Sequence, residues 1–322
     1  MALTSPTPRP LAARARHWAQ AHLLGLLTLG AALSAALPGH AASTVLADQA
    51  PSAALGRPLP FTVYLPDGYE KAQQPYPVVY LLHGAGGDEN EWRTKGGAVE
   101  TLDGLIKRGL IRPSVVVMPT AGPASWWADG AAEKAGTAIM NELLPYVEAR
   151  YRVQKERSGR AIGGLSMGGY GALNLSLRHP QKFCGAAVIS PAIYDPLPPE
   201  TSAARRTPQF VRNGQFDADT WKALNYPAAL DAYRAGAARV PMWIVSGDHD
   251  YLGIAPMSAN LFWRLHQIQP RQVELRVIDG DHEWLVFRDA LPDALGIGMI
   301  AVGIVGNVVI NKLSPTTAER SS

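Results

Sequence analysis

The stretch IGGLSMGGYGALNLSL, residues 162–177, sets one serine among five glycines and continues as an apolar, helix-like pattern. The residues RAIGG before Ser166 read as a buried strand, and those after it predict a helix. Residues 164–168 (GLSMG) therefore form a G-x-S-x-G pattern at a strand-to-helix turn. Such a turn presents a nucleophilic serine above a sheet, and its glycines let the strand and the helix approach closely. The alternative is a glycine-rich turn whose serine merely caps the helix.

Outward from this turn, short β-type runs alternate with helical patterns. Several runs are apolar on both alternating faces, as strands covered by helices on either side are. The alternation predicts an α/β fold with a mostly parallel central sheet and helices on both faces. Residues 195–236 are expected to form a short irregular excursion over the sheet. The predicted strands are 61–65, 77–83, 114–119, 160–166, 185–190, 242–247 and 273–279, and predicted helices include 137–151, 170–178 and 257–268.

The first 41 residues have the organisation of a secretory signal peptide. Three arginines and no acidic residue precede an apolar run at 23–37, and small residues place the cleavage site after Ala41. An uncleaved anchor is the alternative. Cleavage lowers the formal net charge from +3 to zero, so nothing suggests a nucleic-acid-binding surface. We therefore expect a periplasmic or secreted protein whose catalytic domain spans residues 42–295.

The chain has one cysteine, Cys184, which excludes an intramolecular disulfide and a cysteine-rich zinc site. Residues 296–322 are expected to form a C-terminal tail that is first apolar and then polar. The apolar run at 296–310 contains Asn307 and, at about 15 residues, is shorter than the roughly 20 that a membrane span needs. A packed or loosely ordered tail is favoured over a membrane-associated one.

A serine nucleophile needs a histidine base, and four histidines follow Ser166 in the sequence. His179 ends the helix that the serine starts, about 18 Å away by helix rise. His266 falls inside a predicted amphipathic helix. His282 follows the strand 273–279 in a short Gly-Asp loop, at the strand end where side chains reach the site, and is the predicted base.

The orienting acid should follow the preceding strand, 242–247. Asp248 and Asp250 both stand there, and position alone does not choose between them. Together with His249 and His282, the two aspartates could instead be metal ligands. That alternative leaves the serine turn without a role, so no metal site is predicted.

Backbone N–H groups that hold an oxyanion are expected from two places. The Met167 N–H directly follows the nucleophile, and residues 81–87 (LLHGAGG) end an early strand with a glycine-rich loop that offers the Ala85 N–H. His83 is interpreted as a residue that shapes this loop.

Three side chains are candidates for binding substrate. Trp126, Trp127 and Asp129 lie on a loop after the strand 114–119, at the same sheet edge as the other catalytic loops. Such aromatic rings can stack on a sugar or a phenol, and tryptophans that simply pack the loop are the alternative.

Taken together, LLHGAGGDENEW, SWWAD, ELLPYVEARYRV, RAIGGLSMGGYGALNLSLRHPQKF, SGDHD and GDHEWLVFRDAL resemble the putative-esterase family of α/β-hydrolases. That family includes feruloyl and acetylxylan esterases, S-formylglutathione hydrolases and mycolyltransferases. The resemblance spans residues 60–295 and implies the α/β-hydrolase fold. It selects Asp250 over Asp248, because the family's acid stands three residues after the strand-end glycine, here Gly247. The tail beyond Leu295 departs from the family pattern.

The sequence thus predicts an exported serine esterase that acts through Ser166, His282 and Asp250 and an acyl-enzyme. Its expected substrate is a small-molecule or carbohydrate-linked ester, such as an acylated sugar or a phenolic ester. The reaction needs no metal and no organic cofactor. An acyltransferase with the same triad and a non-catalytic binding protein are the alternatives.

Overall fold

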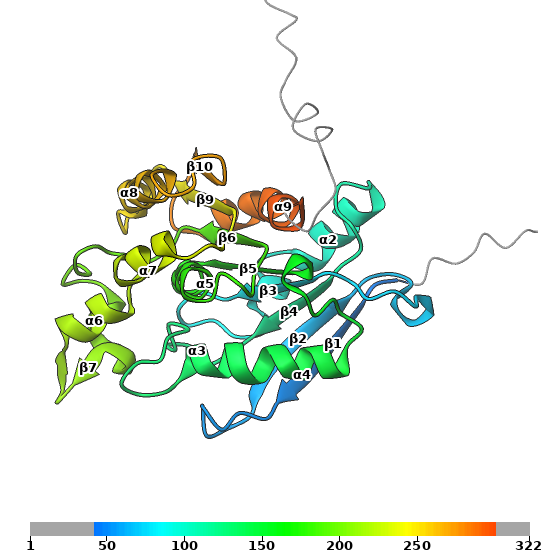
Figure 1. Ribbon diagram of the computed structural model, residues 1–322, viewed down its shortest axis with the longest axis horizontal. Coiled ribbons are helices and arrows are strands. Elements are labelled where there is room, and N and C mark those ends of the chain that lie inside the picture. The colour runs from blue at the N-terminus through cyan, green and yellow to red at the C-terminus, as the bar shows by residue number, and fades with distance from the viewer. Residues whose placement is uncertain (1–41, 301–322) are drawn as a thin grey trace, which may run out of the picture. The chain divides into compact units, whose positions relative to one another are not determined.

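The computed structural model of the protein describes residues 42–300, with side chains described as far as Gly296. The predicted signal peptide and most of the predicted tail lie outside this range. Eight strands form one sheet in the order β1-β2-β4-β3-β5-β6-β9-β10 (Figure 1). β2 is antiparallel to both of its neighbours, and the other pairs are parallel, as predicted. The strands are β1 Thr44–Ala50, β2 Leu59–Leu65, β3 Val78–Leu82, β4 Val115–Pro119, β5 Arg160–Leu165, β6 Gly185–Ile189, β9 Met242–Gly247 and β10 Val273–Ile278.

Helices cover both faces of the sheet, because its central strands are apolar on both sides. In β3, Val78 and Tyr80 pack into one core cluster and Val79 into the other. Side chains of α4, α5 and α8 fill the first cluster, and those of α2 and α9 fill the second. Figure 1 shows these helices around the central sheet. The main helices are α1 Glu91–Thr94, α2 Ala98–Lys107, α3 Ala135–Thr137, α4 Leu144–Arg150, α5 Met167–Arg178, α8 Ile254–His266 and α9 Trp284–Ile300; the π-helical turn η2, Ala138–Leu143, joins α3 to α4.

Residues 195–236 form the expected excursion. It consists of 3-10 turns, a hairpin of two-residue strands and two short helices, with Trp221 and Phe210 packed against Tyr170 of α5. The Tyr170 hydroxyl donates a hydrogen bond to the Leu224 carbonyl at 2.8 Å, which fastens the excursion to the sheet-covering helix. Its elements are η4 Ala203–Arg206, η5 Pro208–Phe210, β7 Val211–Arg212, β8 Gln215–Phe216, α6 Ala218–Leu224, η6 Tyr226–Ala229 and α7 Leu230–Ala235.

Two features differ from the expectation. Strand β1 was not predicted, because four of its seven side chains are exposed and its sequence lacks an apolar run. Helix α9 continues to Ile300, five residues past the predicted domain end at Leu295. Between residues 42 and 300, no helix combines the length and apolar character that a membrane crossing requires.

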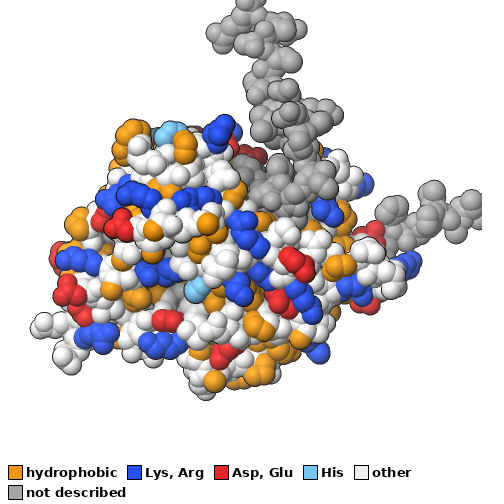
Figure 2. All heavy atoms as spheres, viewed as in Figure 1, with side chains coloured by type: hydrophobic (Ala, Val, Ile, Leu, Met, Phe, Trp, Pro, Cys, Tyr) orange, Lys and Arg blue, Asp and Glu red, His pale blue; other side chains and the backbone are white. Residues whose placement is uncertain are grey.

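The visible surface carries charges of both signs, and the single cysteine is buried. Basic and acidic side chains intermingle over the face shown in Figure 2. Cys184 is buried just before β6, and burial raises the pKa of its thiol to about 11. The thiol is therefore protonated and out of contact with solvent at neutral pH.

Candidate active site

Ser166 stands alone between β5 and α5 in a strained backbone conformation. Its φ of 54° and ψ of −115° lie in a region that L-residues rarely adopt. The flanking glycines make this turn possible. A Cβ on Gly164 would lie 2.4 Å from the Gly168 carbonyl oxygen, and a Cβ on Gly168 would lie 2.3 Å from the Leu82 carbonyl oxygen. The close approach of strand and helix that the G-x-S-x-G pattern predicts is therefore present.

Two hydrogen bonds connect Ser166 to His282 and Asp250. His282 Nε2 lies 2.9 Å from Ser166 Oγ, and His282 Nδ1 lies 2.7 Å from Asp250 Oδ2. The Asp250 side chain has no exposed surface, and that of His282 is 9% exposed. The three side chains come from the carboxyl ends of β5, β9 and β10, which meet at one edge of the parallel sheet. The structure thus brings together the three residues that the sequence selected.

Asp248 has a different environment from Asp250. Its Oδ1 accepts hydrogen bonds from the Gly280 N–H at 3.0 Å and from His249 Nδ1 at 2.6 Å. The Gly280 N–H, followed by the His249 side chain, lowers the pKa of Asp248. Asp248 therefore ties the loop after β9 to the loop after β10.

Asp281 was missed by sequence reasoning. Its Oδ1 accepts the backbone N–H of Tyr251 at 2.9 Å and that of His282 at 2.6 Å. These two N–H groups lower the pKa of Asp281. One carboxylate oxygen thus clamps the loop that carries the acid to the loop that carries the histidine. The only signal in the sequence is an aspartate in a Gly-Asp turn, which is common wherever side chains cap loops.

The backbone predicted to hold an oxyanion runs beside the serine. A Cβ on Gly84 would lie 3.6 Å from Ser166 Cβ and 2.6 Å from Leu165 Cδ1. Ala85, the next residue, is exposed. Met167 is the first residue of α5, so its N–H has no acceptor within the helix. Met167 thus directly follows the nucleophile, and Gly84, the residue before Ala85, packs against it.

The side chain of His83 supports the glycine-rich loop that carries Ala85. Its Nδ1 lies 2.7 Å from the Gly84 carbonyl oxygen, its Nε2 lies 2.9 Å from Thr120 Oγ1, and the residue is 1% exposed. Burial lowers the pKa of His83, which favours the neutral ring. A neutral imidazole has one N–H, and here both ring nitrogens bond to protein atoms, so His83 is interpreted as a residue that supports the loop and not as a base.

The proposed stacking role of the tryptophans does not fit the structure. Trp126 is 3% exposed and Trp127 is 1% exposed. Their indole N–H groups donate to Thr207 Oγ1 at 3.1 Å and to the His83 carbonyl at 3.3 Å. Asp129 accepts two hydrogen bonds from Thr137, through its N–H and its hydroxyl. The alternative of loop-packing tryptophans describes these residues better, because their rings are enclosed by protein.

The aspartates and histidines separate into two groups. Asp250 and His282 bond to each other beneath the surface, whereas Asp248, His249 and Asp279 gather in an exposed cluster with ligand atoms within 4.8 Å of one another. The four-residue metal site considered from the sequence is therefore not assembled.

Comparisons with known proteins agree on one family. The family description "Putative esterase" matches residues 52–297. The chain is 36% identical to an esterase from Mycobacterium tuberculosis, MT1326, over 132 residues. This alignment covers 39% of this chain and 27% of the relative. The chain is 30% identical over 200 residues to an endo-1,4-beta-xylanase/feruloyl esterase from Xylanibacter ruminicola, covering 59% of this chain and 27% of that protein. The matches thus span about a quarter of the length of these relatives.

Solved structures share the fold. A ferulic acid esterase, 28% identical, superposes with a TM-score of 0.67 over 81% of this chain and 99% of its own. An S-formylglutathione hydrolase from Staphylococcus aureus, 19% identical, gives a TM-score of 0.62 over 81% of this chain and 98% of its own, which supports the fold alone. With its serine turn, its mostly parallel sheet and a family match over most of its length, the chain belongs to the putative-esterase family of α/β-hydrolases.

Proposed function

We propose that the protein is a serine esterase that hydrolyses a carboxylic ester through an acyl-enzyme. The observation that carries this proposal is the hydrogen-bonded series from Ser166 Oγ through His282 to the buried Asp250. Serine is a poor nucleophile unless a base removes its proton, and here the imidazole lies within reach of the hydroxyl. Membership of the esterase family supports the same chemistry.

Each member of the series has a distinct role in the proposal. Asp250 accepts a hydrogen bond from His282 Nδ1, which leaves Nε2 unprotonated and facing Ser166. Nε2 takes the serine proton during attack and returns it to the departing alcohol. Water then cleaves the acyl-enzyme by the same proton transfers in reverse. No step requires a metal or an organic cofactor.

The negative charge that develops on the carbonyl oxygen needs donors already in place. In the proposal, the N–H groups of Met167 and Ala85 supply them, and the positive end of helix α5 adds to the stabilisation. Removal of one such donor typically costs about 10²- to 10³-fold in rate. Gly84, packed against the serine turn, fixes the loop that carries Ala85.

The substrate class proposed is an ester of a sugar or of a phenolic acid. The ferulic acid esterase of similar structure and the xylanase/feruloyl esterase relative support it. Because Trp126 and Trp127 are enclosed, an aromatic surface for the substrate must come from elsewhere. Tyr251 follows Asp250, is 73% exposed, and its ring lies edge-on to the His282 ring with centroids 6.3 Å apart. Tyr251 is the aromatic side chain best placed to pack against a bound ring.

A panel of chromogenic esters tests the activity. Acyl chains of increasing length are compared with feruloyl and acetylated sugar esters, with the Ser166→Ala variant as control. We expect turnover by the wild-type protein and none above background by the variant. Absence of turnover across the whole panel would contradict the proposal.

An acyltransferase is the second candidate, favoured by a specific relative. A diacylglycerol acyltransferase/mycolyltransferase from Mycobacterium leprae is 30% identical over 62% of this chain and 62% of its own length. The same triad would then pass the acyl group to an alcohol instead of water. Measuring the ratio of free acid to transferred acyl product, with and without a sugar acceptor, separates the two reactions.

We further propose that the protein is exported to the periplasm or the medium. The support is the leader sequence itself: three arginines, the apolar run at 23–37 and small residues ending at Ala41. The absence of any pair of cysteines means that the exported domain depends on its core and hydrogen bonds for stability.

A further inference from the structure

A cavity of about 250 Å³ lies away from the serine, between the C-terminal half of α5 and the helical segment that α3 begins. None of Ser166, Asp250 and His282 lines it. Asn174, its nearest lining residue along α5, follows Ser166 by eight helical positions, or about 12 Å of helix rise. The cavity is therefore separate from the candidate active site.

The wall of the cavity that α5 forms carries polar groups, and some of their hydrogen-bonding atoms have no partner among the described residues. The Asn174 side chain donates from Nδ2 to the Tyr170 carbonyl at 3.0 Å. Its Oδ1 is buried and accepts no hydrogen bond from any residue that the structure describes. A buried acceptor without a donor is unfavourable, so this oxygen favours any ligand or water that brings an N–H or O–H.

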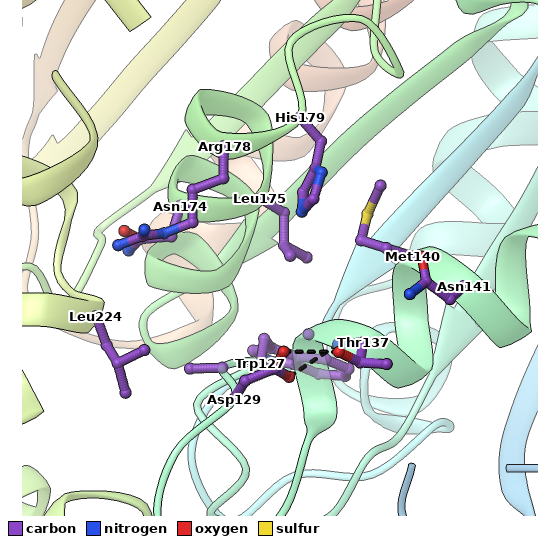
Figure 3. A pocket seen from close by; sticks show the side chains of 12 residues that line it. Trp127, Asp129, Thr137, Met140, Asn141, Asn174, Leu175, Arg178, His179 and Leu224 are labelled. Atoms are coloured by element: carbon purple, nitrogen blue, oxygen red, sulfur yellow. Dashed lines mark hydrogen bonds between the residues drawn. The ribbon is translucent and has the colours of Figure 1, made fainter. Parts of the chain in front are cut away.

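Two further side chains of this wall can act as donors. Arg178 lies one helical turn after Asn174 (Figure 3) and is exposed. It donates from Nη2 to the Ala223 carbonyl at 2.9 Å, which uses one of its five N–H groups. His179 is half-buried and lines the cavity. Burial, followed by the charges of Arg178 and Lys182, lowers the pKa of His179. The neutral ring has one donor and one acceptor nitrogen.

The opposite wall carries the acceptor. Asp129 is held in place by two hydrogen bonds from Thr137, from its N–H at 2.8 Å and from its hydroxyl at 2.7 Å (Figure 3). A carboxylate oxygen can accept more than one bond, so Asp129 keeps capacity for a ligand hydroxyl. Apolar surface from Met140, Leu175 and Leu224 separates these polar groups.

We propose that this cavity is a second binding site, for a neutral polyhydroxylated ligand with the size of one sugar ring. Asn174 Oδ1 and Asp129 require donors from the ligand, and Arg178 requires acceptors. A hydroxyl group is both a donor and an acceptor. The C–H faces of a sugar ring can pack against the apolar surface that lies between these polar side chains. The carboxylate of Asp129 would repel an anion and the guanidinium of Arg178 would repel a cation, so a neutral ligand is favoured. The volume lies just below the roughly 300–1,000 Å³ of drug-sized sites, which suits a single ring.

The site does not depend on ester hydrolysis, and binding to D-xylose tests it directly. Titration is followed by saturation-transfer NMR on the full-length protein, with benzoate as an anionic probe. We expect D-xylose to bind and benzoate neither to bind nor to displace it. Arg178→Ala should weaken binding on the order of tenfold, the loss expected for charge-assisted hydrogen bonds. Asn141→Trp, at an exposed position of the cavity lining, should block binding by filling the entrance.

Lys182→Ala is the matched control, since Lys182 is an exposed basic residue four positions after Arg178 that does not line the cavity. It should bind D-xylose like the wild type. All three variants should hydrolyse chromogenic esters normally, which keeps this test distinct from that of the esterase activity. The proposal is overturned if D-xylose does not bind, if benzoate binds in its place, or if Arg178→Ala and Asn141→Trp leave binding unchanged.

Discussion

The carboxylate of Asp250 lies 2.7 Å from His282 Nδ1 and is fully enclosed, whereas the carboxylate of Asp248, two residues earlier, bonds to Gly280 and His249. Asp250→Asn should lower kcat by about 10⁴, because an amide cannot hold the imidazole in the tautomer that accepts the serine proton. Asp248→Asn should cost far less. Steady-state kinetics on a chromogenic ester compare the two variants, and equal losses would remove Asp250 from its proposed role.

Ser166→Ala should reduce ester hydrolysis by several orders of magnitude while the protein remains folded. Ser166→Gly should be equally inactive yet more stable than the wild type by about 1 kcal/mol, because glycine relieves the positive φ of 54°. Urea unfolding of the three proteins measures this difference. A glycine variant no more stable than the alanine variant would show that the turn stores no strain.

Gly168→Ala should destabilise the protein by at least about 2 kcal/mol, because the added Cβ would lie 2.3 Å from the Leu82 carbonyl oxygen. Backbone atoms cannot move aside as a flexible side chain can. Gly104→Ala is the control: nothing lies within 4 Å of its Cβ position in α2, and alanine should stabilise the helix by about 1 kcal/mol. Thermal unfolding distinguishes them, and a tolerated Gly168→Ala would contradict the close approach of helix and strand.

Asp281→Ala should make stability less dependent on acid pH. The folded pKa of Asp281 is lowered by the N–H groups of Tyr251 and His282, so its contribution is fully present above the ordinary value of 3.8 and is lost as the pH falls through the folded pKa. The difference in unfolding free energy between wild type and variant should therefore shrink as the pH falls from about 5 towards the acid limit of folding. Urea unfolding at several pH values measures it. A difference that stays constant with pH would mean that the clamp does not act through the ionised carboxylate.

Cell fractionation tests the proposed export. We expect a mature N-terminus near Ala42, found by N-terminal sequencing, and recovery in the soluble periplasmic or extracellular fraction. The opposite result is a mature protein in the membrane pellet that is released when the chain is truncated after Ile300. That outcome would assign membrane association to the C-terminal tail.

The sequence was sufficient for seven of the eight strands of the sheet and for the residues around Ser166, because both depend on local patterns. Parallel strands buried on two faces are apolar throughout, and the glycines around Ser166 form a recognisable local pattern, although Gly168 is required by its close approach to Leu82, far away in the sequence. The choice of Asp250 over Asp248 needed the family resemblance, since both follow the same strand.

What the sequence could not supply depends on partners far away along the chain. Trp126 and Trp127 stand on the right loop, but their enclosure is decided by Thr207, from the excursion, and by His83. Asp281 acts on Tyr251, 30 residues earlier, and no local pattern distinguishes it from a solvated turn aspartate. Position relative to the sheet edge could be predicted, whereas the exposure of a side chain there could not.

The burial of Cys184 has a practical consequence for spectroscopy. Because this is the only thiol in the chain, and because it is protonated and shielded, maleimide reagents should leave the native protein unmodified. A cysteine introduced at any exposed position would then carry a fluorophore or spin label alone, with no need to replace the native residue first. For example, cysteines could replace Lys182, in the loop between α5 and β6, and Tyr251, in the loop between β9 and α8. The distance between labels on these two cysteines would report on movement of one loop relative to the other.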